Sequence, residues 1–404
     1  MFLANPRADR RPYDDELQTI LSVAAGRESR QRLSCWNRLA AQPTPAWMMP
    51  NLAASLDVAS ITVKDESRRS SLGSFKALGA PNALILLLMR RWPERSWTAV
   101  ELFAGQHADA LRDVVVITAT DGNHGSALAA AAQSVGCRCV IVLHAHVSLE
   151  RERSIAELGA EVVRIQGNYD QSVNEAARLA RANGWEVVSD TSYEGYEEVP
   201  RDVMQGYGVI AEELLESTPG RGDCPYTHVI LQGGVGGLAA GIVSHFWQRY
   251  GAQRPHFVVV EPEQAECLFQ SARQGRPARA TGSIDSVMAG LACGETSPLA
   301  WRFLQPAVDV FMTVSDAQAV AAMRVLAEGR FGDIPIVAGE SGAAGLAALQ
   351  ALMQVPEWRR AAALDGRSRV LLINTEGATA PSVYAELVGR GHETVLQAQR
   401  SWSG

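Results

Sequence analysis

Short apolar runs alternate along most of the chain with longer segments of helical periodicity. The runs are rich in β-branched residues and end in glycine or polar turns, which predicts strands covered on both faces. The predicted strands are Ser60–Lys64, Val114–Thr118, Arg138–Leu143, Glu161–Ile165, Glu186–Ser189, His228–Leu231, Phe257–Glu261 and Val370–Asn374. The predicted helices are Phe75–Arg90 (kinked at Pro81), Gly125–Val135, Glu150–Leu158, Gln171–Ala182, Gln205–Glu216, Gly237–Tyr250, Asp316–Ala327 and Ala343–Met353. This alternation predicts an α/β fold built on mostly parallel sheets.

The predicted strands fall into two clusters, at residues 98–195 and 225–380. We therefore expect two open, twisted sheets flanked by helices, with a cleft between them. Clefts of such folds lie beyond the carboxyl ends of the strands. The motifs with candidate chemistry all lie at such ends.

Composition and charge narrow the class of protein. The chain has 404 residues, 47% of them hydrophobic and 20% charged, which is typical of a globular protein with two domains or one large unit. The net charge of −7 disfavours a nucleic-acid partner. No apolar segment is long enough for a membrane span and no secretory signal is visible, so we expect a cytoplasmic protein without membrane contact.

The six cysteines do not follow the paired spacing of zinc sites, so no metal site is predicted. In a cytoplasm they should be reduced and mostly packed as small apolar residues. Cys267 and Cys293 flank a stretch rich in glycine and arginine, and a disulfide between these two stays open.

The stretch "VKDESRRSSLGSFKALG" offers a candidate nucleophile. A predicted strand ends at Lys64, Ser74 is placed to cap the next helix, and Lys76 falls in its first turn. A helix N-terminus disfavours a positive charge, so we expect a lowered pKa for Lys76, which suits an amine that forms a Schiff base. Lys64 and Lys76 are the two lysines of the chain. Alternatively, Lys76 is an ordinary surface lysine exposed to solvent.

The stretch "TATDGNHG" also joins a strand to a helix. Its loop contains Asp121, Gly122, Asn123, His124 and Gly125. Backbone donors at a helix N-terminus normally bind an anion, so the carboxylate of Asp121 is unexpected there. We expect His124 to brace the loop rather than to act as a base.

A glycine-rich turn, "LQGGVGGL", follows the predicted strand His228–Leu231. Glycines in such a turn can offer several N–H groups to a phosphate. The turn lacks the GxGxxG order and comes late in the chain, so by itself it leaves open a nicotinamide-dependent oxidoreductase, another phosphate-bearing cofactor or a merely tight turn. Two further strand ends carry Asp190, which could be a helix cap, and Thr375, whose hydroxyl could reach a ring nitrogen or simply form a turn.

In their order and spacing, "SFK", "GNHG", "GGVGG" and a late strand ending in threonine resemble the pyridoxal-phosphate enzymes of the tryptophan-synthase β type (fold type II). The resemblance extends from about Thr44 to Pro381. It implies a small domain at residues 98–195 and a large cofactor-binding domain at residues 1–97 and 196–404, with the active-site cleft between them. It further implies the following site: Lys76 forms the Schiff base with the cofactor, Gly233, Gly234, Val235, Gly236 and Gly237 hold its phosphate, Asn123 contacts its phenolic oxygen, and Thr375 faces its pyridine nitrogen.

Within this family, "TDGNHG" and "SDTSYEGYEEVPRDVMQGYG" resemble the diaminopropionate ammonia-lyases more than the dehydratases, which usually have Ser or Thr in place of Asp121. The stretches "GLACGE" and "AGESGAAG" also resemble the ammonia-lyases. This resemblance implies α,β-elimination of 2,3-diaminopropionate to pyruvate and ammonia by a homodimer. Asp121 would take the Cα proton of the D-isomer and Asp190 that of the L-isomer, while Gly122 and His124 would line the substrate site.

The segment "RRSSLGSFK" departs from the pattern of these lyases, because Ser70 and Ser71 replace bulkier residues. A dehydratase or lyase for another β-substituted amino acid, such as serine, threonine or a hydroxyaspartate, therefore stays open. Two further classes of protein fit less well. A nicotinamide-dependent oxidoreductase is disfavoured by the glycine order, and a non-catalytic ligand sensor is disfavoured by the joint presence of Lys76, Asp121 and Asp190.

Overall fold

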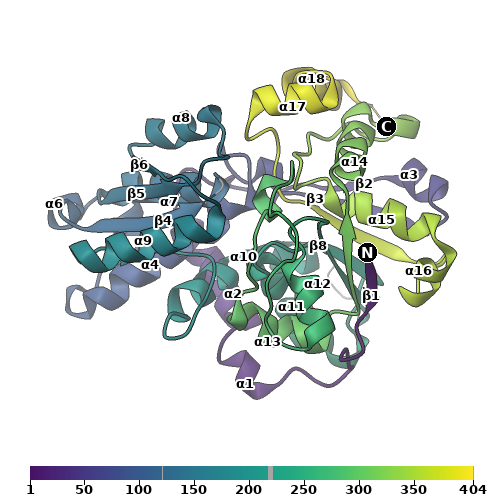
Figure 1. The fold of residues 1–404 in the computed structure, drawn as a ribbon, viewed down its shortest axis with the longest axis horizontal. Helices are drawn as coiled ribbons and strands as arrows, with labels where there is room; N and C mark the ends of the chain where they lie inside the picture. The colour runs from purple at the N-terminus through teal and green to yellow at the C-terminus, as the bar shows by residue number, and fades with distance from the viewer. Residues whose placement is uncertain (121, 217–221, 404) are drawn as a thin grey trace.

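The computed structural model describes residues 1–120, 122–216 and 222–403. Within these residues the longer strands form two sheets, which lie side by side in Figure 1, the smaller one on the left. The larger sheet has seven strands in the order β1-β10-β9-β8-β11-β3-β2. Their bounds are β1 Phe2–Ala4, β2 Ala46–Met48, β3 Ser60–Asp65, β8 His228–Gln232, β9 His256–Pro262, β10 Val310–Val314 and β11 Arg369–Asn374.

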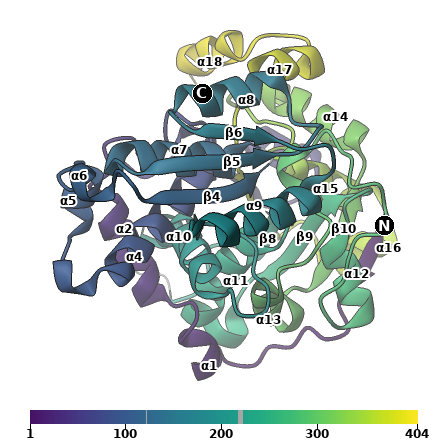
Figure 2. The same cartoon turned by 60° about the vertical axis from the view of Figure 1, so that its left-hand side comes forward.

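The five inner strands of this sheet are parallel, and β1 and β2 pair antiparallel at its two edges. The second sheet is fully parallel, with four strands in the order β6-β5-β4-β7 (Figure 2). Their bounds are β4 Val115–Thr120, β5 Arg138–Leu143, β6 Glu161–Arg164 and β7 Glu186–Val187. All four lie inside the predicted small domain, 98–195, whose exact boundaries stay a prediction.

Helices cover both faces of both sheets. On the large sheet they are α2 Val23–Leu33, α10 Glu198–Glu216, α11 Gly237–Tyr250, α12 Cys267–Gln274 and α13 Pro298–Ala307 on one side, and α3 Pro50–Ser55, α14 Asp316–Glu328, α15 Ala344–Gln354 and α17 Pro381–Val388 on the other. On the small sheet, α7 Asn123–Val135 faces the large sheet's helices together with α4 Ala80–Arg91 and α5 Ala99–Phe103, whereas α9 Tyr169–Asn183 covers the outer face.

The remaining helices are shorter or peripheral. They are α1 Asp15–Gln18, α6 Ala108–Leu111, α8 Leu149–Glu157, α16 Pro356–Ala361, α18 His392–Ser401 and the 3₁₀ turns η1 Glu66–Arg68, η2 Phe75–Leu78, η3 Pro93–Arg95, η4 Gly251–Gln253, η5 Ala289–Leu291 and η6 Arg330–Gly332. No helix among residues 1–120, 122–216 and 222–403 combines the length and apolarity that a membrane span requires.

Successive side chains of the central strands lie in two different hydrophobic cores, one on each face of the large sheet. In β8, Val229 and Leu231 belong to the core under α10 and α11, whereas Ile230 belongs to the core under α14 and α15. Because neighbouring residues of a strand point to opposite faces, a strand buried on both faces must be apolar throughout. The near-continuous apolar runs of the sequence follow from this arrangement.

The predicted helices and strands differ from the structure in a few places. The helix expected from Phe75 begins as the turn η2, and α4 starts at Ala80 with Pro81 in its first turn, so Pro81 does not kink it. Proline is tolerated there because the first N–H groups of a helix have no acceptor within it. Helix α10 begins at Glu198, before the predicted start at Gln205, and the strands β1, β2 and β10 were not predicted.

A buried charge cluster joins β3, η1 and α10 close to the cleft. Lys64 Nζ lies 2.6 Å from Glu213 Oε2, and Arg69 bonds both Glu66 and Glu213 at 2.7–2.9 Å. The side chains of Lys64, Glu66, Arg69 and Glu213 are all less than 5% exposed. Burial alone would raise the pKa of Glu213, but Arg69 and Lys64 outweigh it and lower that pKa.

We expect Glu213→Gln to destabilise the protein by about 3 kcal/mol, because removing one partner leaves buried cations uncompensated. The thermal or urea unfolding midpoint measures this loss. The lowered pKa means that Glu213 contributes stability above its unfolded-state pKa, so the difference from wild type should shrink as the pH falls through the folded-state pKa. The exposed Glu357, 3.9 Å from Arg360, provides the control, and Glu357→Gln should leave the midpoint unchanged. Equal midpoints for both variants would contradict a structural role for the cluster.

Candidate active site

A cavity lies between the two sheets, beyond the carboxyl ends of β4, β8 and β11. Ligand sites of α/β folds lie at such strand ends. The cavity brings together predicted residues from distant parts of the chain: Lys76, Gly122, Asn123, His124, Asp190, Gly233, Gly234, Val235, Gly237 and Thr375. Gly236 does not line the cavity. Asp121 lies outside the described residues.

Lys76 projects from η2 and forms an ion pair with Asp190, with 2.5 Å between Nζ and Oδ2. Its Nζ also lies 5.2 and 5.8 Å from the ring centres of Phe75 and Tyr207. Burial lowers the pKa of Lys76, but the charge of Asp190 outweighs this effect, so the pKa is raised above its ordinary value. The expectation of a lowered pKa was wrong for this state, because a contact from the other sheet dominates over the helix terminus.

Ser74 does not cap the helix, contrary to prediction, because its side chain makes no capping hydrogen bond. Its backbone instead forms an antiparallel bridge with Glu376, and the N–H of Phe75 donates to the carbonyl of Thr375 at 3.0 Å. The lysine loop is therefore fixed to the end of β11. Lys64 is buried in its ion pair with Glu213 and does not line the cavity, whereas Lys76 does.

The glycine turn between β8 and α11 leaves several backbone donors unused. The N–H groups of Gly234, Val235, Gly237 and Leu238 make no hydrogen bond within the described part of the chain, although the turn is buried. Gly234 and Gly236 have φ of 61° and 101°, which favour glycine. Donors gathered at a helix N-terminus and facing a cavity are suited to an anion such as phosphate.

Asp190 lies just beyond β7 and is 7% exposed. Burial raises its pKa, but the charge of Lys76 more than offsets this, so the pKa of Asp190 is well below its usual range. The hydroxyl of Tyr169 donates to Oδ1 at 3.4 Å, and Nδ1 of His124 lies 3.9 Å from Oδ2. Asp190 is therefore an ionised carboxylate at the amine of the cavity.

His124 is held by its other nitrogen, since Nε2–H donates to the carbonyl of Val188 at 2.8 Å. Burial lowers the pKa of His124, which keeps the ring neutral. This contact ties the start of α7 to the segment that precedes Asp190, as a bracing role requires.

The model of the family described as "Pyridoxal-phosphate dependent enzyme" matches residues 38–376. The chain belongs to this family. It is 36% identical to the diaminopropionate ammonia-lyase of Escherichia coli strain K12 over 96% of this chain and 97% of that protein. It is 38% identical to the diaminopropionate ammonia-lyase of Salmonella typhimurium strain LT2 over 86% of this chain and 88% of that protein.

Solved structures of this pyridoxal-phosphate-dependent family are similar to the structure of this chain. The Escherichia coli diaminopropionate ammonia-lyase in complex with an aminoacrylate-PLP azomethine reaction intermediate superposes with a TM-score of 0.85, at 34% identity and 96% coverage of both chains. Maize serine racemase, at 19% identity, has the same fold with a TM-score of 0.68. The predicted fold class, fold type II with two mostly parallel sheets, is thus confirmed, as is the dependence on pyridoxal phosphate.

The residues of the cavity fit the cofactor of this family. The unused N–H groups of the glycine turn suit its phosphate, and Lys76 is an amine able to bind its aldehyde. Thr375, which directly follows β11 and is 2% exposed, and Asn123, the first residue of α7, also line the cavity. The cavity therefore offers donors for a phosphate, an amine for an aldehyde and polar side chains for a ring.

No disulfide joins Cys267 and Cys293 in the structure. Cys267 lies beneath the glycine turn, where Sγ donates to the carbonyl of Gly234 at 3.4 Å, and Cys293 lines the cavity. Burial raises the pKa of the Cys267 thiol well above its ordinary value, so this thiol stays protonated.

The structure adds residues that were not singled out from the sequence. Tyr169, Tyr207, Gln232, Ser341 and Glu376 line the cavity. Gln232, Ser341 and Glu376 had a local signal, because they lie within or beside the motifs quoted above. Tyr169 and Tyr207 lie on the helices α9 and α10, whose inward faces cannot be read from one sequence.

Proposed function

We propose that this protein is an ammonia-lyase that converts 2,3-diaminopropionate to pyruvate and ammonia by α,β-elimination. The observation that carries the proposal is Asp190, held 2.5 Å from the amine of Lys76 inside the cavity. Two curated relatives at 36% and 38% identity bear the name diaminopropionate ammonia-lyase, which supports the same assignment.

When bound, pyridoxal phosphate delocalises the electron pair left by removal of the Cα proton of an amino acid. We assign its phosphate to the turn Gly233–Gly237, its aldehyde to Lys76, its phenolic oxygen to the amide of Asn123 and its pyridine nitrogen to the hydroxyl of Thr375. A neutral hydroxyl leaves that nitrogen largely unprotonated, a setting that the family uses for elimination.

The base for the Cα proton is Asp190 for the L-isomer and Asp121 for the D-isomer, with Lys76 assisting on the L side. Asp190 is a weak base while Lys76 is an ammonium ion beside it. Loss of the proton from Lys76 would remove that positive charge, and burial would then raise the pKa of Asp190 toward the range that a general base requires.

The charge of the site also favours a cationic β-substituent. Asp190 places negative charge in the cavity, and the resemblance to the lyases implies that Asp121 adds to it. This charge attracts the β-ammonium of diaminopropionate and repels a β-carboxylate such as that of hydroxyaspartate. We assign the α-carboxylate to the loop of Gly122 and His124, as the resemblance to the lyases implies. The β-amine leaves as ammonia, and hydrolysis of the remaining enamine releases the second ammonia and pyruvate.

Pyruvate release from a panel of amino acids tests the proposal. We expect kcat/KM for D- or L-diaminopropionate to exceed that for D-serine, L-serine and L-threonine at least about tenfold, a difference of about 1.4 kcal/mol in transition-state binding. Ammonia should be released at twice the rate of pyruvate. Preference for serine or threonine, with one ammonia per pyruvate, would instead support a dehydratase.

We further propose that the protein is a cytoplasmic homodimer, as the resemblance to its family implies. Light scattering of the purified protein should give twice the mass of the chain.

A further inference from the structure

Glu376 holds the side chain of Asn123. It follows Thr375 at the end of β11 and is 2% exposed. Its Oε2 accepts a hydrogen bond from Nδ2 of Asn123, and its Oε1 accepts one from the backbone N–H of Ser341 at 3.0 Å. Because both oxygens have partners, the carboxyl group is fixed, and it determines which way the amide of Asn123 points.

A second buried carboxylate lies beside the first. Glu340 is also 2% exposed and accepts a hydrogen bond from the guanidinium of Arg151. Burial raises the pKa of Glu376 and the charge of Glu340 raises it further, whereas Arg151 lowers it. Two neighbouring buried carboxylates repel each other, so Arg151 is the cation that allows both to stay in place.

Arg151 reaches this pair from the other sheet. It lies on α8, which follows β5 and packs on the small sheet, whereas Glu340 and Glu376 belong to segments of the large one. The aliphatic part of Arg151 contacts the loop before Asn123, since a Cβ at Gly122 would lie 3.1 Å from its Cδ. The side chain of Arg151 therefore lies beside the loop before Asn123 and also balances the negative charge of Glu340 and Glu376.

We propose that Glu376 and Arg151 are positioning residues, which orient the Asn123 amide so that an N–H faces the cofactor. The inference rests on the proposed contact of Asn123 with the phenolic oxygen. A primary amide has two N–H groups, so the one bonded to Glu376 leaves the other for that oxygen. Without Glu376 the amide is free to turn over and present its own oxygen, which cannot donate.

Titration of the apoprotein with pyridoxal phosphate tests the proposal without any substrate. We expect Glu376→Ala and Arg151→Met each to weaken cofactor affinity about tenfold, the scale of one charge-assisted hydrogen bond, and to shift the absorbance band of the bound cofactor. Arg151→Lys keeps the charge and should recover most of the affinity. In an Asn123→Ala background, Glu376→Ala should cost less than about twofold, because the residue through which it acts is gone.

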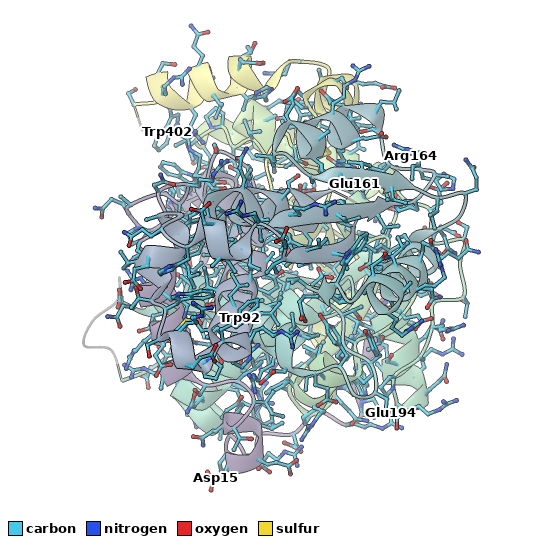
Figure 3. The ribbon with its side chains drawn as sticks, turned by 90° about the vertical axis from the view of Figure 1, so that its left-hand side faces the viewer. Asp15, Trp92, Glu161, Arg164, Glu194 and Trp402 are labelled. Atoms are coloured by element: carbon cyan, nitrogen blue, oxygen red, sulfur yellow. The ribbon has the colours of Figure 1, made fainter. Side chains whose placement is uncertain are left out.

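A matched control removes a different ion pair of the same helix. Arg164 lies on the edge strand β6, as labelled in Figure 3, and pairs with Glu152 of α8. Arg164→Met should keep cofactor affinity within about twofold, because Arg164 bonds Glu152 and the backbone carbonyls of residues 144, 145 and 147 and has no contact with Glu376 or Glu340.

Wild-type affinity and absorbance in Arg151→Met, or an equal cost of Glu376→Ala with and without Asn123, would overturn the proposal. If Glu376→Ala or Arg151→Met does not fold, Glu376→Gln and Arg151→Gln, which also remove the charges, replace them, and an unchanged absorbance band in both would likewise overturn the proposal. A protein that binds the cofactor normally yet releases no pyruvate from diaminopropionate contradicts the proposed function instead.

Discussion

Lys76→Ala should lose lyase activity by about 10³-fold or more and carry no covalently bound cofactor, because covalent attachment and a positioned amine are lost together. The absorbance band of the purified protein near the edge of the visible range should disappear. The substitution also leaves Asp190 without the cation that lies 2.5 Å away, so burial then raises its pKa.

The chain offers a direct control, because Lys64 and Lys76 are its two lysines. Reduction of the loaded enzyme with borohydride should attach the cofactor irreversibly to one lysine, and peptide mapping should find it on Lys76. Lys64 is bonded to Glu213 at 2.6 Å and is closed off from the cavity. A label on Lys64, or a coloured Lys76→Ala protein, would contradict the assignment.

Asp190→Asn should reduce kcat for L-diaminopropionate by about 10²–10³-fold, the scale of losing a general base, with a smaller effect on the D-isomer. Asparagine keeps the volume and still accepts a hydrogen bond from Lys76, so the change removes mainly the negative charge and the basicity. Pyruvate formation from the separate isomers measures the effect. Asp121→Asn should instead reduce kcat for D-diaminopropionate more than kcat for the L-isomer.

The exposed Glu194, four residues beyond Asp190 in the same loop, gives a matched control. Glu194→Gln should leave both isomers unaffected. If Asp190→Asn and Asp121→Asn each slowed the two isomers equally, the two acids would not divide the faces of Cα between them.

Much of the fold follows from local patterns in the sequence. The strand Arg138–Leu143 and the helix Gly237–Tyr250 have the predicted bounds, because each is a long, uninterrupted pattern closed by glycine or polar residues. The edge strands β1 and β2 have three residues each, too few to show a period. The apolar run of β10 lies between two helices, where its five residues cannot be distinguished from a buried helical segment.

The residues of the cavity could be predicted only where a strand or helix end fixes them. Lys76, Asn123 and the glycine turn all lie at such ends. The pKa shifts of the cavity residues could not be predicted. The direction of the shift of Lys76 is set by Asp190, which lies 114 residues away in sequence. The contact of Arg151 with Glu340 spans 189 residues and joins two sheets, so no local pattern could have revealed it.

The position of β11 has a consequence for biosynthesis. It is the last strand in sequence among the described residues, yet it lies inside the large sheet, between β8 and β3. On the ribosome, the N-terminal strands β3 and β2 therefore cannot join β8, β9 and β10 until residue 374 has been translated. Thr375 and Glu376 follow immediately. The cofactor cavity is thus completed only after residue 376 has been translated, and a nascent chain that ends before β11 lacks the part of the cavity that Thr375 and Glu376 form.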